Sequence, residues 1–373
     1  MSAGRPSPVE AGRTRALLGI ALLVLVAASA YRLWWTPPPP AVRELSGPSM
    51  GTTWSVKLAA PELDAAQRAE LDWAVRDVLE RIEQLASTYR EDSELSRFNR
   101  HRSPEPFPAS PETLAIFDIA RQVGERSRGA FDVTVEPLVR AWGFGAATRA
   151  PGPPQPAELE ALRELVDYRR VGIDPERGGL TKSDPRVRCD LSAIAKGFAV
   201  DALVAELAGR GYRDALVEVG GELRASGRRP DGETWRVAVE RPDAAARSAW
   251  KVFPLRDAAL ATSGDYRNFY EHAGRRLSHT IDPRSGRPID HGLASVSVVH
   301  PRAAWADAWA TALHVLGPEA GPALAAREGL AAYFIERLPD GSLRACASPA
   351  FEALSGGPPE GPAQDSCRPS SPR

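Results

Sequence analysis

The fold is decided by residues 190–227, which read DLSAIAKGFAVDALVAELAGRGYRDALVEVGGELRASG. A turn of small residues opens this stretch and leads into residues 195–210, whose apolar spacing predicts a helix. Residues 215–219 follow with a run of apolar and β-branched side chains, which is typical of a strand. Small residues before a helix let the backbone approach a ligand, so the same stretch is also a candidate binding site.

The flanking sequence predicts more strands and helices in irregular order. The patterns predict strands at residues 53–58, 235–239 and 293–299, helices at 61–85, 111–128 and 304–315, and a Pro/Gly-rich surface loop at 151–156. Because strands and helices mix without regular βαβ spacing, we expect an α+β fold with a largely antiparallel sheet.

The composition indicates a large folded domain and argues against nucleic-acid binding. The chain has 373 residues, of which 43% are hydrophobic, so the length suits two domains or one large one. Its 47 basic residues are balanced by 48 acidic ones, and no basic cluster with interleaved aromatic residues occurs. Neither GxGxxG nor the P-loop pattern is present, so a standard Rossmann or P-loop phosphate site is not expected.

The three cysteines are Cys189, Cys346 and Cys367. An odd number without CxxC spacing supports neither a zinc site nor a disulfide framework. Cys346 and Cys367 are close enough in sequence to pair in an oxidising compartment, and the sequence leaves this pairing open.

The N-terminus predicts export of the rest of the chain. Three arginines precede an apolar run at residues 16–30, and positive charge before an apolar segment keeps the N-terminus in the cytoplasm. Residues 16–35 form either an uncleaved transmembrane anchor, which we favour, or a signal peptide cleaved after Ala28-Ser29-Ala30. The expected organisation is a cytoplasmic region at 1–15, the anchor or signal peptide at 16–35, a Pro-rich linker at 36–45, the domain at 46–350 and a disordered tail at 351–373.

Asp307 and Thr311 form the first candidate site. They are four residues apart, so on a helix they lie on one face, one turn from each other. A carboxylate and a hydroxyl are hard oxygen ligands that suit Mg²⁺, which usually keeps substrate phosphates in its remaining positions. Taken alone, the pair is better explained by an Asp that caps or forms an ion pair and a Thr that packs its methyl group.

Two further fragments carry polar side chains beside a turn. Residues 190–197 precede a helix, whose N-terminus attracts anions, and Lys196 adds a positive charge. The alternative is an ordinary helix start capped by Asp190 or Ser192. Farther along, His279 and Asp282 could form a general base and the carboxylate that orients it, or simply a polar turn. The other histidines are interpreted as surface or loop residues.

Aromatic residues near residues 129–145 offer faces for a flat heterocycle. Tyr89, Phe131 and Phe144 could stack on such a ring. The alternative is that Phe131, Trp142 and Phe144 belong to the core, and we favour the core for Trp142.

The order of these fragments is more informative than any one of them. The chain carries in series MGTTWSV at 50–56, STYREDSELSRFN at 87–99, GAFDVTVEPLVRAWGFG at 129–145, DLSAIAKGFAVD at 190–201, VEVGGELRASG at 217–227, TSGDYRNFY at 262–270, LSHTIDPRSGRPI at 277–289 and ADAWATAL at 306–313. Motif by motif, this series resembles the FAD:protein FMN transferase family (ApbE) over residues 46–335.

The resemblance implies a fold, a reaction and a set of site residues. The implied fold has two interlocked α/β subdomains with FAD between them, preceded here by the N-terminal transmembrane or signal helix. The implied reaction is Mg²⁺-dependent transfer of FMN from FAD to a Ser/Thr hydroxyl of an exported redox-complex protein, with release of AMP. The implied roles are FAD contacts by Met50, Tyr89, Ala130, Phe131, Asp132, Asp190 and Lys196, metal binding by Asp307, Thr311 and the Ala193 carbonyl, and catalysis by His279 with Asp282.

Two alternatives share the same site. Water in place of the acceptor hydroxyl would make the protein an FAD pyrophosphatase that yields FMN and AMP. A non-catalytic FAD-binding protein is the other, although passive binding needs no combination of Asp307, Thr311 and His279.

The chain also departs from many relatives because its N-terminal segment has no lipobox cysteine.

Overall fold

The structure, a computed structural model, describes residues 19, 21–27, 29, 41–60, 62–146, 152–242, 248–265, 269–272, 274–355 and 364–367. The chain divides into two units, 1–41 and 42–373, and each is described by itself. In the first unit residues 21–27 are helical, and the rest of the predicted anchor or signal segment lies outside the described residues. Within the described part of the chain, no helix combines the length and apolar character needed to cross a membrane.

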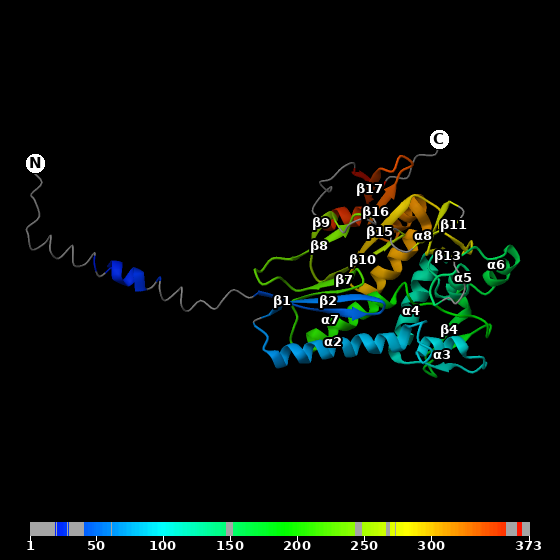
Figure 1. The fold of residues 1–373 in the computed structure, drawn as a ribbon, viewed down its shortest axis with the longest axis horizontal. Coiled ribbons are helices and arrows are strands. Elements are labelled where there is room, and N and C mark those ends of the chain that lie inside the picture. Colours follow the sequence, from blue (N-terminus) through cyan, green and yellow to red (C-terminus); the bar gives the residue numbers. More distant parts are fainter. Residues whose placement is uncertain are drawn as a thin grey trace, which may run out of the picture. The chain divides into compact units, whose positions relative to one another are not determined.

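A nine-stranded sheet forms the centre of the larger unit (Figure 1). Its strand order is β1-β2-β6-β7-β10-β15-β16-β17-β18. Neighbouring strands pair antiparallel from β2 to β17, and β17 and β18 pair parallel. The prediction of an α+β fold with a largely antiparallel sheet is therefore confirmed.

The strands of this sheet are β1 (Ala41–Ser49), β2 (Thr52–Ala60), β6 (Ala215–Val219), β7 (Glu222–Ser226), β10 (Ala258–Gly264), β15 (Leu293–His300), β16 (Ala331–Arg337), β17 (Leu343–Ala347) and β18 (Gln364–Ser366). The helices are α2 (Ala65–Ala86), α3 (Glu94–Arg100), α4 (Pro111–Arg126), α5 (Glu136–Ala141), α6 (Pro156–Arg163), α7 (Ala195–Gly209), α8 (Ala303–Arg327) and α9 (Pro349–Ser355). The smaller elements are β3 (Phe107–Pro108), η1 (Val133–Val135), η2 (Tyr168–Arg170), β4 (Val171–Asp174), β5 (Gly179–Lys182), β8 (Trp235–Glu240), β9 (Ala249–Leu255), β11 (Phe269–His272), β12 (Arg275–Ser278), β13 (Ile281–Asp282) and β14 (Arg287–Pro288).

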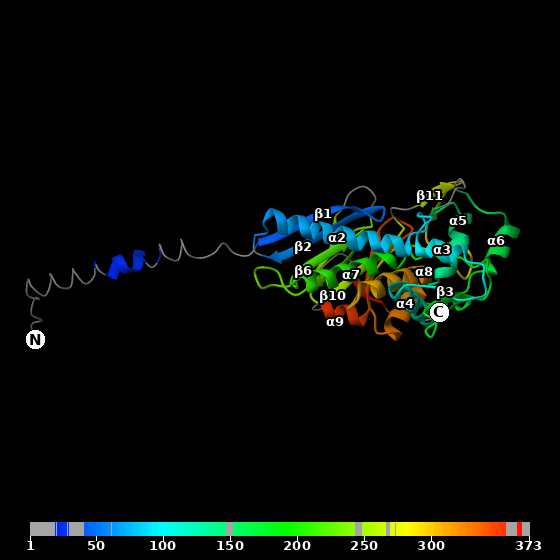
Figure 2. The ribbon, with the colours of Figure 1, turned by 90° about the horizontal axis from the view of Figure 1, so that it is seen from below.

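The two faces of the sheet bury two separate cores. Successive residues of a strand point to opposite faces, and in β16 Phe334 belongs to one core while Tyr333 and Ile335 belong to the other. The first core, which we call the helix-side core, lies under α2, α7 and α8, as the view in Figure 2 shows. The second, the far-side core, lies under the β8–β9 hairpin and α9, whose Phe351 is fully buried.

A third, smaller cluster joins α5, α6 and the β13–β14 hairpin. Leu138, Trp142, Leu159 and Ile281 are its buried members. Trp142 is 5% exposed and its indole N–H donates to the Gly286 carbonyl at 2.8 Å. Trp142 is therefore a core residue, as the sequence indicated.

The predicted strands and helices are found, with two instructive differences. Residues 235–239 form a strand, but β8 pairs with β9 outside the main sheet. The helix predicted over 304–315 is the first segment of α8: Gly317, with φ of 79°, interrupts the helical conformation there, and a second helical segment follows to Arg327. A glycine accepts this left-handed conformation without strain.

Both ends of the domain differ from the predicted boundaries. Residues 41–45, expected in the linker, belong to β1, and residues 36–40 lie outside the described part. The disordered tail expected over 351–373 is wrong for its described stretches, since 351–355 lie in α9 and 364–366 form β18. The prediction failed because it rested on the Pro/Gly/Ser-rich composition of the tail, whereas one apolar side chain, Phe351, is fully buried and holds α9 in place.

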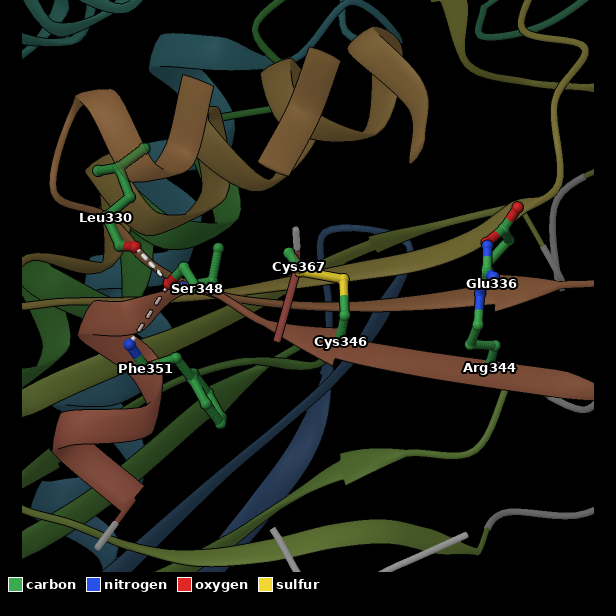
Figure 3. Close-up of a disulfide and its surroundings, with 8 residues drawn as sticks. Leu330, Glu336, Arg344, Cys346, Ser348, Phe351 and Cys367 are labelled. Carbon is green, nitrogen blue, oxygen red and sulfur yellow. Dashed lines mark hydrogen bonds and ion pairs between the residues drawn. A yellow bond between two sulfur atoms is a disulfide. The ribbon is translucent and has the colours of Figure 1, made fainter. Parts of the chain in front are cut away.

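A disulfide joins the C-terminal strand to the sheet (Figure 3). Cys346 of β17 is bonded to Cys367, and their Cα atoms are 5.1 Å apart. Next to it Ser348 accepts the N–H groups of Ala332 and Phe351 and donates to the Leu330 carbonyl, which fixes the start of α9. The pairing that the sequence left open is thus present in the structure.

Candidate active site

Two tight hairpin turns meet at the start of α7. Met50 and Gly51, between β1 and β2, have φ of 51° and 68°, and Gly220 and Gly221, between β6 and β7, have φ of 62° and 104°. Two-residue turns with positive φ match the twist of the strands they connect. The Gly220 N–H donates to the Thr53 carbonyl at 2.9 Å, which ties the two turns together.

Lys196 of α7 packs directly on the second turn. A Cβ atom added at Gly220 would lie 2.8 Å from Thr52 Cγ2 and 3.1 Å from Lys196 Cδ. Position 220 therefore requires glycine for its space as well as for its conformation. This close approach fixes the lysine stem between the two hairpins.

Lys196, Glu222 and Asp307 form a buried charged cluster. Lys196 Nζ lies 2.7 Å from Glu222 Oε2, and Asp307 Oδ2 accepts the N–H of Gly197 at 2.9 Å. Glu222 and Asp307 are only 2% and 5% exposed. One ammonium group thus faces two carboxylates that have lost their water, so the cluster is short of positive charge.

The pKa shifts in the cluster follow from this burial. Burial raises the pKa of Glu222 to about 7, although Lys196 acts against the shift. Burial also raises the pKa of Asp307, opposed by Lys196 and the Gly197 N–H. Burial disfavours the charge on Lys196, but Glu222 and Asp307 outweigh it and raise the pKa of Lys196. Additional positive charge would stabilise both carboxylates in their ionised form.

The predicted metal ligands lie on neighbouring elements. Asp307 and Thr311 are one turn apart on α8, as predicted, and Thr311 is half-buried. Ala193 lies in the turn before α7, four residues before Gly197. In a longer helix the Gly197 N–H would be donated to the Ala193 carbonyl, but here it is donated to Asp307. These donors are all oxygens beside a cluster that lacks positive charge, which fits Mg²⁺.

His314 occupies the next turn of α8 and is fully buried. Its Nε2 lies 3.1 Å from the Leu293 carbonyl, and its Nδ1 lies 3.1 Å from Ser263 Oγ of β10. Burial lowers the pKa of His314 to about 3, so the ring is neutral. Because a carbonyl only accepts, Nε2 carries the proton and Ser263 donates to Nδ1. The interpretation of His314 as a surface or loop residue is therefore wrong.

His279 lies near this end of α8. Its charge helps to lower the pKa of His314, which follows Thr311 by three residues on α8. It also lowers the pKa of Asp265, against the larger effect of burial. Its ring packs edge-on against Phe144, with ring centroids 6.5 Å apart. Asp282, the predicted orienting partner, binds Arg284 through both carboxylate oxygens at 2.9 and 3.0 Å. An orienting role for Asp282 stays a prediction, and Arg284 competes for the same oxygens.

The predicted FAD contacts form a second group beside the start of α7. Tyr89 is 71% exposed, which leaves its ring available for stacking, and its pKa is raised by partial burial and by nearby Asp190. The Asp190 N–H donates to the Val133 carbonyl at 2.7 Å, so residues 130–132 lie next to residue 190.

Ala130, Phe131 and Asp132 are largely buried in this structure. Asp132 accepts hydrogen bonds from the Thr134 N–H, the Thr134 hydroxyl and the Tyr168 N–H. Burial raises the pKa of Asp132 to about 6. The carboxylate thus holds the local chain together, and the FAD contacts expected of these three residues stay predictions.

Sequence reasoning missed two residues that build the site. Glu222 lies in VEVGGELRASG, yet we assigned it no role, although a carboxylate next to two glycines was the available signal. Asn99 ends STYREDSELSRFN and holds the backbone of Cys189 from both sides, donating to its carbonyl at 2.8 Å and accepting its N–H at 2.7 Å. No local pattern in the sequence shows that this amide pairs with a residue 90 positions away.

Known proteins similar to this chain agree with one another. The family model described as ApbE family matches residues 50–334. The chain is 42% identical over 298 residues to an FAD:protein FMN transferase of Vibrio cholerae serotype O1, covering 80% of this chain and 88% of that protein. It is 38% identical over 315 residues to the FAD:protein FMN transferase of Escherichia coli K12, covering 84% and 89%.

Solved structures give the same result. The flavin transferase ApbE from Vibrio cholerae superposes with a TM-score of 0.76 at 38% identity, covering 84% of this chain and 99% of that one. The apo form of the Pseudomonas stutzeri flavinyl transferase ApbE gives a TM-score of 0.77 at 39% identity, covering 85% and 97%.

Proposed function

The chain belongs to the ApbE family and is an FAD:protein FMN transferase, and we propose that it works with Mg²⁺ on a Ser or Thr hydroxyl of an exported protein. The observation that carries the proposal is the buried cluster of Lys196, Glu222 and Asp307 at the start of α7. Its excess of negative charge would repel the diphosphate of FAD, so a cation is needed for the substrate to bind there.

Asp307, Thr311 and the carbonyl of Ala193 would hold Mg²⁺. A divalent cation bound there supplies electrostatic stabilisation of the charge that develops on the phosphates. Lys196 and the N-terminus of α7 bind and orient the diphosphate, since both carry positive charge towards it. Gly197 keeps Asp307 in position by donating its N–H to Oδ2.

His279 accepts the proton of the acceptor hydroxyl. The hydroxyl oxygen forms a bond to the FMN phosphorus while the bond from that phosphorus to the bridging oxygen breaks. AMP leaves with the electron pair, and the hydroxyl proton passes to His279. Such a base contributes roughly 10²–10⁴-fold to the rate. Asp282 orients His279 whenever Arg284 releases one of its oxygens.

The flavin half of the substrate is bound by the group around Asp190. The exposed ring of Tyr89 stacks on a flat heterocycle, Met50 lies at the tip of its hairpin, and Ala130, Phe131 and Asp132 line the neighbouring turn. FAD would lie between two interlocked subdomains. The domain would be exported, held at the periplasmic side of a bacterial inner membrane by residues 16–35 or released there after cleavage, and its acceptor would be a membrane redox-complex protein.

Mass spectrometry of an acceptor protein tests this function. After incubation with the enzyme, FAD and Mg²⁺, the acceptor should gain the mass of one FMN on a Ser or Thr. Omitting the acceptor tests the hydrolase alternative, because AMP release at an undiminished rate would mean that water is the true nucleophile. An unmodified acceptor under all conditions, with no AMP formed, would contradict the proposal.

A further inference from the structure

The first turn of α8 is held by a carboxylate from α7. Asp201 Oδ1 accepts the N–H of Ala303 at 2.9 Å, and Oδ2 accepts the N–H of Ala304 at 3.1 Å. Arg302, the residue before α8, makes no capping bond with its own side chain. Asp201 therefore supplies from a neighbouring helix the acceptor that the residue before a helix usually provides. Arg224 of β7 donates to Oδ1 at 2.7 Å and fixes the carboxylate.

The arrangement is reciprocal. Ile194, before α7, also lacks a capping side chain, and Asp307 of α8 accepts the N–H of Gly197 in the first turn of α7. Each helix thus caps the N-terminus of the other. Both carboxylates lie at the positive end of a helix dipole, where negative charge is stabilised.

The two helices also approach each other too closely to slide. A Cβ atom at Gly197 would lie 2.4 Å from the Ala303 carbonyl oxygen and 2.8 Å from Asp307 Cβ. Gly197 and Asp201 are one turn apart on α7, and both contact the first turn of α8. Asp307 is one turn further along α8, so its position follows from how Asp201 holds Ala303 and Ala304.

We propose that Asp201 is a positioning residue that sets the Mg²⁺ affinity of the site without touching the metal. The inference rests on the proposed function, because it requires Asp307 to be a metal ligand. Residues that orient ligands typically change metal affinity by about 10–100-fold when they are removed. Removal of Asp201 frees two N–H groups of α8 and the Arg224 guanidinium, so α8, with Asp307 and Thr311, is no longer held in register with Ala193 before α7.

Isothermal titration of the full-length protein with MgCl₂ tests this inference. Asp201→Ala should weaken Mg²⁺ binding by about 10–100-fold. Asp201→Asn keeps one carbonyl oxygen for a backbone N–H and should weaken binding by a smaller factor. The matched control is Asp64→Ala, because Asp64 caps α2 by accepting the Gln67 N–H at 2.8 Å. That variant should lose stability and retain the wild-type affinity for Mg²⁺.

The possible outcomes separate this inference from the function on which it rests. Wild-type affinity in both Asp201 variants, while Asp307→Asn abolishes binding, would overturn the positioning role and leave the metal site intact. Absence of Mg²⁺ binding in the wild type would overturn the metal site itself. A loss in Asp64→Ala equal to that in Asp201→Ala would show a general effect of stability and would also overturn the inference.

Discussion

The two faces of the central sheet are buried for different purposes. The helix-side face carries Lys196, Glu222 and Asp307 within its packing, where one ammonium group and a helix N-terminus only partly offset two buried carboxylates. The far-side face is held by aromatic packing, with the ring of Phe351 5.2 Å from Phe253 and 5.1 Å from Tyr333. A partly buried neutral pair also contributes there, since the Trp250 indole N–H donates to the Tyr333 hydroxyl at 3.1 Å.

The difference follows from what covers each face. Helix starts present free N–H groups that can satisfy a buried carboxylate, whereas the β8–β9 hairpin uses its backbone groups within its own pairing. We therefore expect substitutions on the helix side to change chemistry, and substitutions on the far side to change stability alone.

The strongest test of this contrast is His279→Ala. Transfer of FMN should fall by about 10²–10⁴-fold, because the acceptor hydroxyl loses its base. FAD affinity, measured by fluorescence titration, should stay near the wild-type value. The control is His101→Ala, because the His101 ring bonds the nearby Glu105 carbonyl and packs edge-on against Phe107, away from the candidate site residues. Unchanged turnover in His279→Ala would reject the assignment.

Phe351→Ala tests the far side. Removal of a fully buried aromatic ring should lower the free energy of unfolding by about 3–5 kcal/mol. Urea unfolding measures this loss, and specific activity well below the midpoint should match the wild type. If transfer falls in proportion to the lost stability, the far-side core also shapes the site and the contrast between the faces fails.

Breaking the disulfide probes the edge of the sheet, where Cys346 and Cys367 are partly buried against the helix-side core. Replacement of Cys346 and Cys367 by serine should cost about 2–4 kcal/mol, since the bond closes a 21-residue separation. Thermal unfolding with and without a reductant gives the same comparison for the wild type. Transfer activity should be unchanged, and a loss of activity on mild reduction would connect this edge to the site.

The pH dependence of stability should arise from the helix side. Asp132 is almost fully buried, and this burial raises its pKa from the ordinary 3.8 to about 6 in the folded protein. The folded state therefore binds this proton more tightly, so this carboxyl stabilises the protein at low pH and the contribution is lost between about pH 4 and 6. Relative to Asp132→Asn, wild-type stability should fall by up to about 3 kcal/mol across that range. Parallel curves would contradict the shift.

The sequence was most informative where a physical period repeats. Helical spacing identified α2, α4 and α7 within a few residues, and alternation identified β2. The same helical period pointed to two candidate site residues, because Asp307 and Thr311 lie one turn apart on a single helix. The ordered motifs supplied the rest of the candidate residues.

The remainder depends on contacts that no local pattern records. The pairing of Lys196 with Glu222 and of Asp307 with Gly197 joins residues 26 and 110 positions apart, and each partner alone resembles an ordinary surface charge or helix residue. His314 follows the same rule, since only the fold shows that Ser263 and the Leu293 carbonyl enclose it. For the C-terminus, the polar and Pro/Gly-rich composition predicted disorder. The burial of Phe351 could not be seen in the sequence, because it depends on packing against Phe253 of β9 and Tyr333 of β16.

The bond between Cys346 and Cys367 secures β18 at the edge of the sheet, and it does so only while the two thiols are oxidised. An uncovered strand offers its free N–H and carbonyl groups to any other chain that can pair with it. In a reducing environment β18 would be attached to β17 by only a short run of backbone bonds, and this side of the sheet could accept a strand from a neighbouring molecule. Once the thiols are oxidised, the disulfide holds β18 in this position, so the protein should be less prone to aggregation under oxidising conditions than under reducing ones.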